Sequence, residues 1–164
     1  MAGIEHAEDA LGLRPLKALT LGERVIDTEA IPWVPYREGI WVKPLRLNRK
    51  TGVWANLTRV EGGGQVNRHY HIGPVTGFVL EGSWYYAGRD WVARKGTMVW
   101  EPPGDIHTLI SNPEGTITLF QLEGALLYVD DDDNVVGFDD VLNHMRTYHE
   151  YCRTAGIEPV DLDY

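Results

Sequence analysis

Apolar and polar residues alternate along most of the chain in short runs, and turn-forming residues separate these runs. Alternation with a period of two is typical of β-strands that bury one face. Gly82, Gly88 and Gly96 stand between runs, where a tight turn favours a residue without a side chain. The pattern predicts an all-β sandwich, jelly roll or barrel. Its strands are expected at residues 40–47, 52–60, 66–71, 76–80, 83–86, 90–93, 97–101, 107–111, 115–122 and 125–129.

Near the C-terminus the hydrophobic period changes to that of a helix. Apolar residues recur at helical spacing at Val141, Leu142, Met145, Tyr148 and Cys152. Asp139 or Asp140 can cap the first turn, and Gly156 lies just after the last one. We predict a helix over residues 139–154 that covers the strands or contacts a second subunit. His144 and His149 lie on different faces of this helix, and we expect both at the surface.

Composition and charge narrow the classes of function. The chain has 164 residues, enough for one domain with a hydrophobic core. Its formal net charge of -9 argues against general nucleic-acid binding, which needs many lysines and arginines facing phosphates. The aspartates from Asp130 to Asp133 are expected to form a solvated hairpin turn, because a calcium loop spaces its oxygen ligands differently.

Cysteine usage and the absence of long apolar runs favour a cytoplasmic protein. Cys152 is the only cysteine, so no disulfide can form within the chain. The first residues include acidic side chains and no long apolar run, unlike a signal peptide. No stretch approaches the roughly 18 apolar residues of a membrane span. We therefore expect no membrane and no nucleic-acid partner.

The residues best suited to chemistry are three histidines. His69 and His71 flank Tyr70, so on a strand both imidazoles project from one face. His107 follows a Pro-Pro-Gly turn, in which proline and glycine fix a tight reversal. Two imidazoles from one strand and a third from a distant turn can hold one divalent metal ion. For His69 and His71 taken alone, a pair of surface histidines is the alternative.

The spacing of these histidines resembles the two sequence motifs of the cupin superfamily. Eight positions match these motifs in register: Gly63, His69, His71, Gly82, Gly96, Pro102, Gly104 and His107. The resemblance implies a cupin fold, which is a double-stranded β-helix or jelly-roll barrel, with the C-terminal helix added. It also implies that His69, His71 and His107 are metal ligands. We expect an N-terminal arm at 1–22, the cupin barrel at 23–137, and a helix and tail at 138–164 in the same domain.

One position departs from the cupin pattern. The superfamily's usual glutamate ligand falls at Val75, which cannot bind a metal. Glu81 and Glu101 are the candidates for a carboxylate from elsewhere in the chain. Glu81 stands beside Gly82 at an expected turn, which favours a solvated side chain. If Glu101 faces inward, it is a direct ligand, an acid–base group beside the metal, or a structural hydrogen-bonding residue.

Two segments, 68–91 and 101–109, resemble more closely the small cupin dioxygenases that cleave carbon–carbon bonds in hydroxyketones and diketones. The resemblance is to 2,4'-dihydroxyacetophenone dioxygenase and its relatives, and more distantly to acetylacetone dioxygenase. These enzymes use a three-histidine iron site, in agreement with Val75. The resemblance implies one divalent metal, Fe(II) rather than Zn or Ni, and a small-molecule substrate that reacts with O2.

Other interpretations stay open at this point. The same fold could carry a different metalloenzyme, such as an isomerase or hydrolase, or a non-catalytic metal-dependent sensor or small-molecule-binding module. Since cupin barrels commonly pair through edge strands and N-terminal arms, we expect a homodimer. Arg89 could attract an anionic ligand or lie at the surface. Aromatic candidates for the lining of a pocket, with core packing as the alternative, are Trp54, Trp84, Tyr85, Tyr86 and Trp100.

Overall fold

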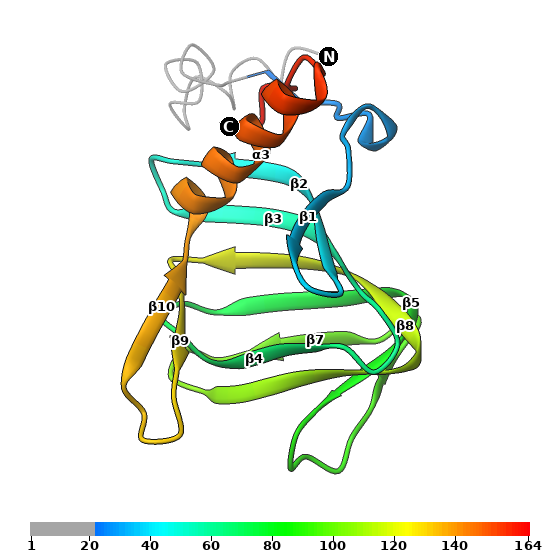
Figure 1. Ribbon diagram of the computed structural model, residues 1–164, viewed down its shortest axis with the longest axis vertical. Helices are drawn as coiled ribbons and strands as arrows, with labels where there is room; N and C mark the ends of the chain where they lie inside the picture. The colour runs from blue at the N-terminus through cyan, green and yellow to red at the C-terminus, as the bar shows by residue number, and fades with distance from the viewer. Residues whose placement is uncertain (1–21) are drawn as a thin grey trace, which may run out of the picture.

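Strands make up most of the part of the chain that the computed structural model describes, residues 22–164 (Figure 1). The prediction of an all-β fold with one C-terminal helix is confirmed. The expected N-terminal arm, 1–22, lies outside the described residues except for Gly22. The elements are a short 3-10 helix η1 (Thr28–Ala30), β1 (Val34–Arg37), β2 (Ile40–Asn48), β3 (Val53–Val60), β4 (Gln65–His71), β5 (Val75–Tyr86), β6 (Ala93–Arg94), β7 (Met98–Glu101), β8 (Ile106–Glu123), β9 (Leu126–Val129), β10 (Val135–Asp139) and helix α3 (Val141–Ala155).

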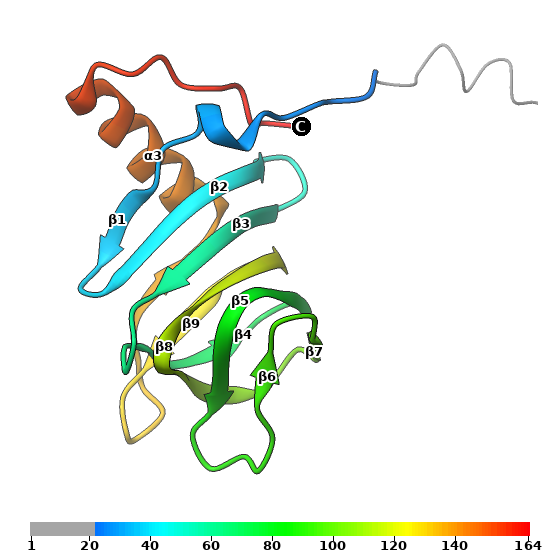
Figure 2. The ribbon, with the colours of Figure 1, turned by 90° about the vertical axis from the view of Figure 1, so that its right-hand side faces the viewer.

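These strands form one antiparallel sheet that curls around its own inner face (Figure 2). The order across the sheet is β1-β2-β3-β8-β4-β9-β10, and β5 pairs with β8, β6 and β7. The long strand β8 therefore connects the two sides of the curl, because it pairs with β3, β4 and β5 along its length. This arrangement brings β4 and β8, which carry the three histidines, side by side.

The structure has two long strands where the sequence pattern predicts four short ones. The expected strands 76–80 and 83–86 are joined in β5, and 107–111 and 115–122 are joined in β8. Gly82 lies in the first expected break, and Gly115 begins the strand expected after the second, but both lie where β5 and β8 are paired and their register shifts. Both adopt a left-handed conformation, with φ of +64° and +78°. A Cβ atom on Gly82 would overlap the carbonyl oxygen of Gly115. Glycine is thus required here by the close approach of two backbones rather than by a turn.

The edge strands β1 and β10 were not expected from the sequence. Each is short, with Pro35 in β1 and Gly137 in β10, and both residues weaken a strand signal. The sheet consequently runs to Asp139, two residues beyond the limit of 137 expected for the barrel. Between β9 and β10, the Asp130 carboxylate accepts hydrogen bonds from the backbone N–H groups of Asp132 and Asn134. The predicted aspartate-rich hairpin turn is confirmed.

Helix α3 packs against β1 and β2 and covers one end of the curled sheet (Figure 2). Asp140 caps its start, since its carboxylate accepts a hydrogen bond from the Asn143 N–H at 2.8 Å. Gly156 ends it in a left-handed conformation. The expected surface position of His144 is wrong. Its side chain shares the buried face with Tyr148, and only His149 of the two helix histidines is exposed.

Two apolar clusters form the core. The larger one lies between the sheet and α3, and consists of Ile31, Val34, Val42, Leu47, Trp54, Val75, Leu122, Leu126, Val141, Tyr148, Cys152 and Leu162. The smaller one contains Ile40, Val60, Val79, Trp84, Tyr86, Ala93 and Leu109. Among residues 22–164, no helix combines the length and apolar content that crossing a bilayer requires.

Candidate metal centre

The three histidines expected to bind a metal point their Nε2 atoms at a common centre. His69 and His71 project from the same face of β4, and His107 on β8 lies directly opposite His69 in the strand register. The Nε2 atom of His71 is 3.1 Å from that of His69 and 2.8 Å from that of His107. The three ligand atoms lie within 4.8 Å of one another, and all three side chains are buried. Alternation along β4 and its pairing with β8 are sufficient to produce this arrangement.

Hydrogen-bond acceptors hold the other ring nitrogens of two of these histidines. His69 Nδ1 lies 2.6 Å from the Asn67 carbonyl oxygen, and His107 Nδ1 lies 3.3 Å from Asp105 Oδ2. Arg89 in turn donates to the Asp105 carboxylate at 3.1 Å. An acceptor at Nδ1 fixes the tautomer in which Nε2 carries the free lone pair. His69 and His107 are therefore oriented as metal ligands by groups that do not themselves reach the centre.

Burial keeps His69 in the form that binds metals. Removal from water, together with the neighbouring His71 and His107, lowers the pKa of His69 to about 3. A neutral imidazole offers a lone pair, whereas an imidazolium does not. Three imidazole nitrogens that meet at one point are a ligand set that suits a divalent metal, so the donor set fits such an ion.

Glu101 is the carboxylate that reaches this centre. It lies on β7, is 3% exposed, and faces Val75 of β5 in the strand register. Its Oε2 atom is 2.9 Å from His71 Nε2 and 3.4 Å from His107 Nε2. Burial raises the pKa of Glu101, but the contacts with His107 and His71 outweigh burial and bring it to about 2. The neighbouring strand thus supplies a carboxylate opposite the valine that replaces the usual glutamate.

Aromatic rings hold the histidines from behind. Tyr86 stacks on His107, with ring centroids 3.6 Å apart and planes 12° apart. Tyr128 meets His69 edge-on at 6.1 Å. Glu81, the other carboxylate considered from the sequence, is exposed on β5 and does not approach the centre. These contacts restrict the rotation of two ligand rings.

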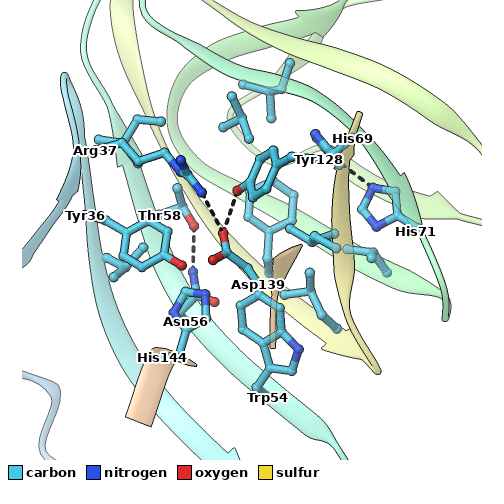
Figure 3. A pocket seen from close by; sticks show the side chains of 18 of the residues that line it. Tyr36, Arg37, Trp54, Asn56, Thr58, His69, His71, Tyr128, Asp139 and His144 are labelled. Atoms are coloured by element: carbon cyan, nitrogen blue, oxygen red, sulfur yellow. Dashed lines mark hydrogen bonds and ion pairs between the residues drawn. The ribbon is translucent and has the colours of Figure 1, made fainter. Parts of the chain in front are cut away.

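His69 and His71 border a cavity whose lining includes residues of both core clusters (Figure 3). Its empty volume is about 590 Å³, including its open mouth. Its lining residues come from both clusters and from β1, β10 and α3: Tyr36, Arg37, Ile40, Val42, Trp54, Asn56, Thr58, Val66, His69, His71, Val75, Tyr86, Glu101, Leu109, Phe120, Leu122, Leu126, Tyr128, Asp139 and His144. Most of these side chains are apolar, as in sites that bind small organic molecules.

Of the aromatic candidates for the pocket lining, Trp54 and Tyr86 line the cavity. Trp100 does not line it. Neighbouring side chains on a strand point to opposite faces, so Trp100 points outward where Glu101 points inward, and Trp100 is 61% exposed. Tyr85 likewise alternates with Tyr86 and lies outside. Trp84 is fully buried beyond the cavity and donates to Thr118 Oγ1 at 3.0 Å. Trp84, Tyr85 and Trp100 are therefore corrected to core or surface positions.

At the other end of the cavity is a polar cluster that the sequence did not indicate. Asp139 of β10 accepts hydrogen bonds from the Tyr128 hydroxyl at 2.6 Å and from Arg37 at 3.3 Å. Tyr36 of β1 stacks on His144 of α3, with ring centroids 4.7 Å apart. Burial, together with Asp139, raises the pKa of Tyr36 and of Tyr128, so both remain protonated. No motif connects these residues, because they come from β1, β9, β10 and α3.

Comparisons with known proteins agree with the fold. A family model described as the ChrR cupin-like domain matches residues 21–127. An RmlC-like cupin protein from Ralstonia eutropha JMP134 is 33% identical, with a TM-score of 0.83, over 88% of this chain and 96% of that chain. An acetylacetone dioxygenase from Acinetobacter johnsonii is 21% identical, with a TM-score of 0.72, over 80% and 93% of the two chains.

A regulatory protein also has this fold. The structure of Rhodobacter sphaeroides SigE in complex with the anti-sigma ChrR matches with 17% identity and a TM-score of 0.50, over 72% of this chain and 78% of that chain. The last two structures resemble the chain in fold alone. No curated protein sequence matches the chain.

Proposed function

Because this chain belongs to the ChrR cupin-like family of the cupin superfamily, we propose that it is a metal-dependent dioxygenase acting on a small hydroxyketone or 1,3-diketone. The single observation that carries this proposal is the convergence of three buried histidine Nε2 atoms beside a cavity, without a glutamate at Val75. The likeness to the acetylacetone dioxygenase fold supports it.

We assign His69, His71 and His107 as the residues that hold the metal, with Fe(II) favoured over Zn or Ni. When bound, Fe(II) would polarise the substrate oxygens and bring O2 next to them, since three protein ligands leave positions open. Imidazole ligands carry no negative charge that would offset a divalent ion, and the Glu101 carboxylate beside them loses its own charge when it accepts a proton from the substrate. This site therefore favours a substrate that binds as an anion through two oxygens, such as an enediolate or a 1,3-diketonate.

Glu101 is the residue we propose to remove the proton that creates this anion. Its Oε2 atom is the carboxylate oxygen next to His71 and His107, and it is buried. A base must lie within hydrogen-bond reach of the proton that it accepts. The apolar side chains of the cavity exclude water from the carbon that becomes electron-rich.

The overall reaction balances without an added reductant. A hydroxyketone R–CO–CH2OH and O2 give R–COOH and HCOOH. The bond between the two oxygenated carbons breaks, and both atoms of O2 enter the products. The substrate carbons supply the electrons that reduce O2. The reaction class therefore needs only the two substrates and the residues described here.

An oxygen electrode tests the proposal. Iron-reconstituted protein should consume O2 in proportion to added 2-hydroxyacetophenone or acetylacetone, with carboxylic acid as product. Zinc-loaded protein is the matched control and should be inactive. Substrate turnover that continues at the same rate without O2 would exclude a dioxygenase.

A non-catalytic sensor is the second candidate, and the match to the ChrR cupin-like domain favours it. Such a protein would use the same metal site and cavity to bind a small molecule without converting it. Stoichiometric binding of metal and ligand with no O2 uptake and no product would support the sensor.

A further inference from the structure

The cavity reaches the surface beside Arg37. Among the described residues that line the cavity, Arg37 is the only exposed one, and its side chain is 40% exposed. Its neighbour Tyr36 lines the cavity as well, because the register of β1 shifts between Pro35 and Arg37 and interrupts the alternation of faces. Solvent therefore meets the cavity at β1, and we expect ligands and metal ions to enter there.

No backbone ladder closes the sheet at this opening. The strands β1 and β10 are the two ends of the strand order, and among the described strands β1 pairs only with β2 and β10 only with β9. Side chains join them instead. Arg37 of β1 forms an ion pair with Asp139 of β10 at 3.3 Å, and its guanidinium carbon lies 4.2 Å from the centre of the Tyr128 ring on β9. Figure 3 shows Arg37 and Tyr128 both directed at Asp139.

The strand β1 is weakly held by its backbone. It has four residues, it pairs on one side only, and Pro35 within it has no N–H group to donate. On the side of the helix, the ring of Tyr36 stacks on His144 of α3. Segments with few backbone hydrogen bonds and few buried apolar contacts open locally at a small cost in free energy. Side-chain contacts therefore contribute most of what keeps this part of β1 in place.

The part of β1 that can move is bounded by two buried anchors. Val34 and Ile40 on either side are 1% and 3% exposed and belong to the two core clusters. Residues 35–38 between them are exposed or half-buried. This segment can therefore leave the cavity while both of its ends stay packed in the core.

We propose that residues 35–38 form a flap over the cavity mouth, and that the ion pair between Arg37 and Asp139 holds this flap closed. Metal ions and small molecules exchange with solvent when the flap is open. Because the flap opens before a metal ion binds or leaves, a weaker ion pair raises both rates by the same factor and leaves the dissociation constant unchanged. The flap would serve a dioxygenase and a sensor alike, so this inference does not depend on the proposed reaction.

Zinc exchange tests the flap without any substrate. The release rate is measured by mixing zinc-loaded protein with chelator, at concentrations where the rate no longer depends on the chelator. The uptake rate is measured by mixing metal-free protein with zinc in stopped flow. In Arg37→Met both rates should rise about fivefold, the factor that corresponds to the upper value for a partly exposed ion pair, with an unchanged dissociation constant. Arg37→Lys keeps a cation opposite Asp139 and should exchange zinc nearly as slowly as the wild type.

A matched ion pair elsewhere in the chain provides the control. Arg49 follows β2, pairs with Asp163 of the C-terminal segment at 2.7 Å, and does not line the cavity. Arg49→Met should therefore exchange zinc at the wild-type rates. Wild-type rates in Arg37→Met would overturn the inference, because the route then lies elsewhere. Faster release without faster uptake would also overturn it, because Arg37 then shapes the metal site itself.

The urea dependence of zinc release tests the flap in the wild-type protein, so the result stands even if Arg37→Met does not fold. Opening of four residues exposes little surface, and the release rate should rise only slightly with urea below the unfolding transition. A release rate that rises with urea as steeply as global unfolding does would mean that the whole chain unfolds to release the metal. That outcome would exclude a flap.

Exchange and turnover separate this inference from the proposed dioxygenase. Faster zinc exchange in Arg37→Met with no O2 uptake by the iron form would remove the dioxygenase and leave the flap intact. O2 uptake by the iron form with unchanged zinc exchange in Arg37→Met would have the opposite meaning.

Discussion

The two ends of the cavity are built in different ways. At the inner end, the three histidines lie on the paired strands β4 and β8, where His69 is directly opposite His107. At the outer end, Asp139, Arg37 and His144 come from β10, β1 and α3, which are the two edges of the sheet and the helix packed on it. The inner end is held by the sheet ladder, and the outer end by side-chain contacts between separate elements.

This difference separates two kinds of residue function. The inner side chains present lone pairs to a common point and should determine metal binding. The outer side chains satisfy one another, as in the Tyr128 hydrogen bond to Asp139, and should determine how firmly β1, β10 and α3 close the cavity. Substitutions at the inner end should therefore change metal affinity with little change in folding, and those at the outer end should do the reverse.

The largest effect is expected for His71→Ala. Its Nε2 atom is the one nearest to both other histidines, so its removal leaves two ligands. Metal affinity should fall by at least about 1,000-fold, since two imidazoles make a poor site for a divalent ion. Metal content after gel filtration and competition with a chelator measure this. His149→Ala, on the exposed face of α3, is the control and should bind one equivalent.

Glu101→Gln tests whether the carboxylate acts as a base or as a ligand. We expect metal content to stay near one equivalent while kcat falls about 100-fold, the usual contribution of a general base. Elemental analysis and O2 uptake on the same sample give both values. Glu81→Gln, exposed on β5, should match the wild type. Loss of the metal together with kcat would instead identify Glu101 as a direct ligand.

The sequence predicts the inner end well, for a physical reason. His69 and His71 are two positions apart on one strand, and the Pro-Pro-Gly turn before His107 marks the third ligand through its resemblance to the second cupin motif, while the pairing of β4 with β8 brings the three side chains together. Asp105 was missed, although it stands two positions before His107 and shares its strand parity. The inward position of Glu101 follows from the pairing register of β5 and β7, which places Glu101 opposite Val75 and which the sequence does not give.

The outer end and the edges of the fold could not be predicted in this way. Whether His144 is buried depends on α3 packing against β1, a strand that the sequence pattern did not reveal. The continuity of β5 and β8 depends on Gly82 and Gly115 meeting in space, although each alone resembles a turn residue. Contacts between distant segments determine both features, and single-sequence periodicity contains no information on them.

At the outer end, Asp139→Asn should destabilise the fold and leave metal affinity unchanged. The carboxylate accepts hydrogen bonds from Tyr128 and Arg37 and is buried, so its loss should cost about 2 kcal/mol. Urea denaturation measures the free energy of unfolding. Asp131→Asn, in the exposed turn, should cost nothing measurable. A large loss of metal affinity in Asp139→Asn would show that the two ends are coupled and remove the distinction between them.

A smaller effect on metal binding is expected for Asp105→Asn. Its carboxylate lies 3.3 Å from His107 Nδ1 and is itself held by Arg89. Groups that orient a metal-binding histidine typically change affinity by about 10- to 100-fold, and the partial exposure of Asp105 favours the low end. Chelator competition should give a weakening of about tenfold. Asp90→Asn, exposed in the same region, should leave the affinity unchanged.

The smallest effect is a dependence of stability on pH that comes from His144. Burial lowers the pKa of His144 to about 4, below its ordinary value of 6.5. The unfolded chain therefore binds a proton between pH 6.5 and 4 that the folded chain does not, so stability is present above pH 6.5 and declines as the pH falls. Between pH 7 and 5.5 the free energy of unfolding should fall by about 1 kcal/mol from this group.

His144→Phe keeps an aromatic ring against Tyr36 and Trp54 and removes the titrating group. Its urea midpoint should change less than that of the wild type between pH 7 and 5.5, and His149→Phe should behave as the wild type does. His69, whose pKa is also lowered by burial, contributes to the pH dependence as well, so the measurement compares the two variants in metal-loaded protein at both pH values. If the urea midpoint of His144→Phe depends on pH as strongly as that of the wild type, the α3 end of the cavity opens to water before the chain unfolds. Closure of the cavity by β1 and α3 is then weaker than the packing of His144 indicates.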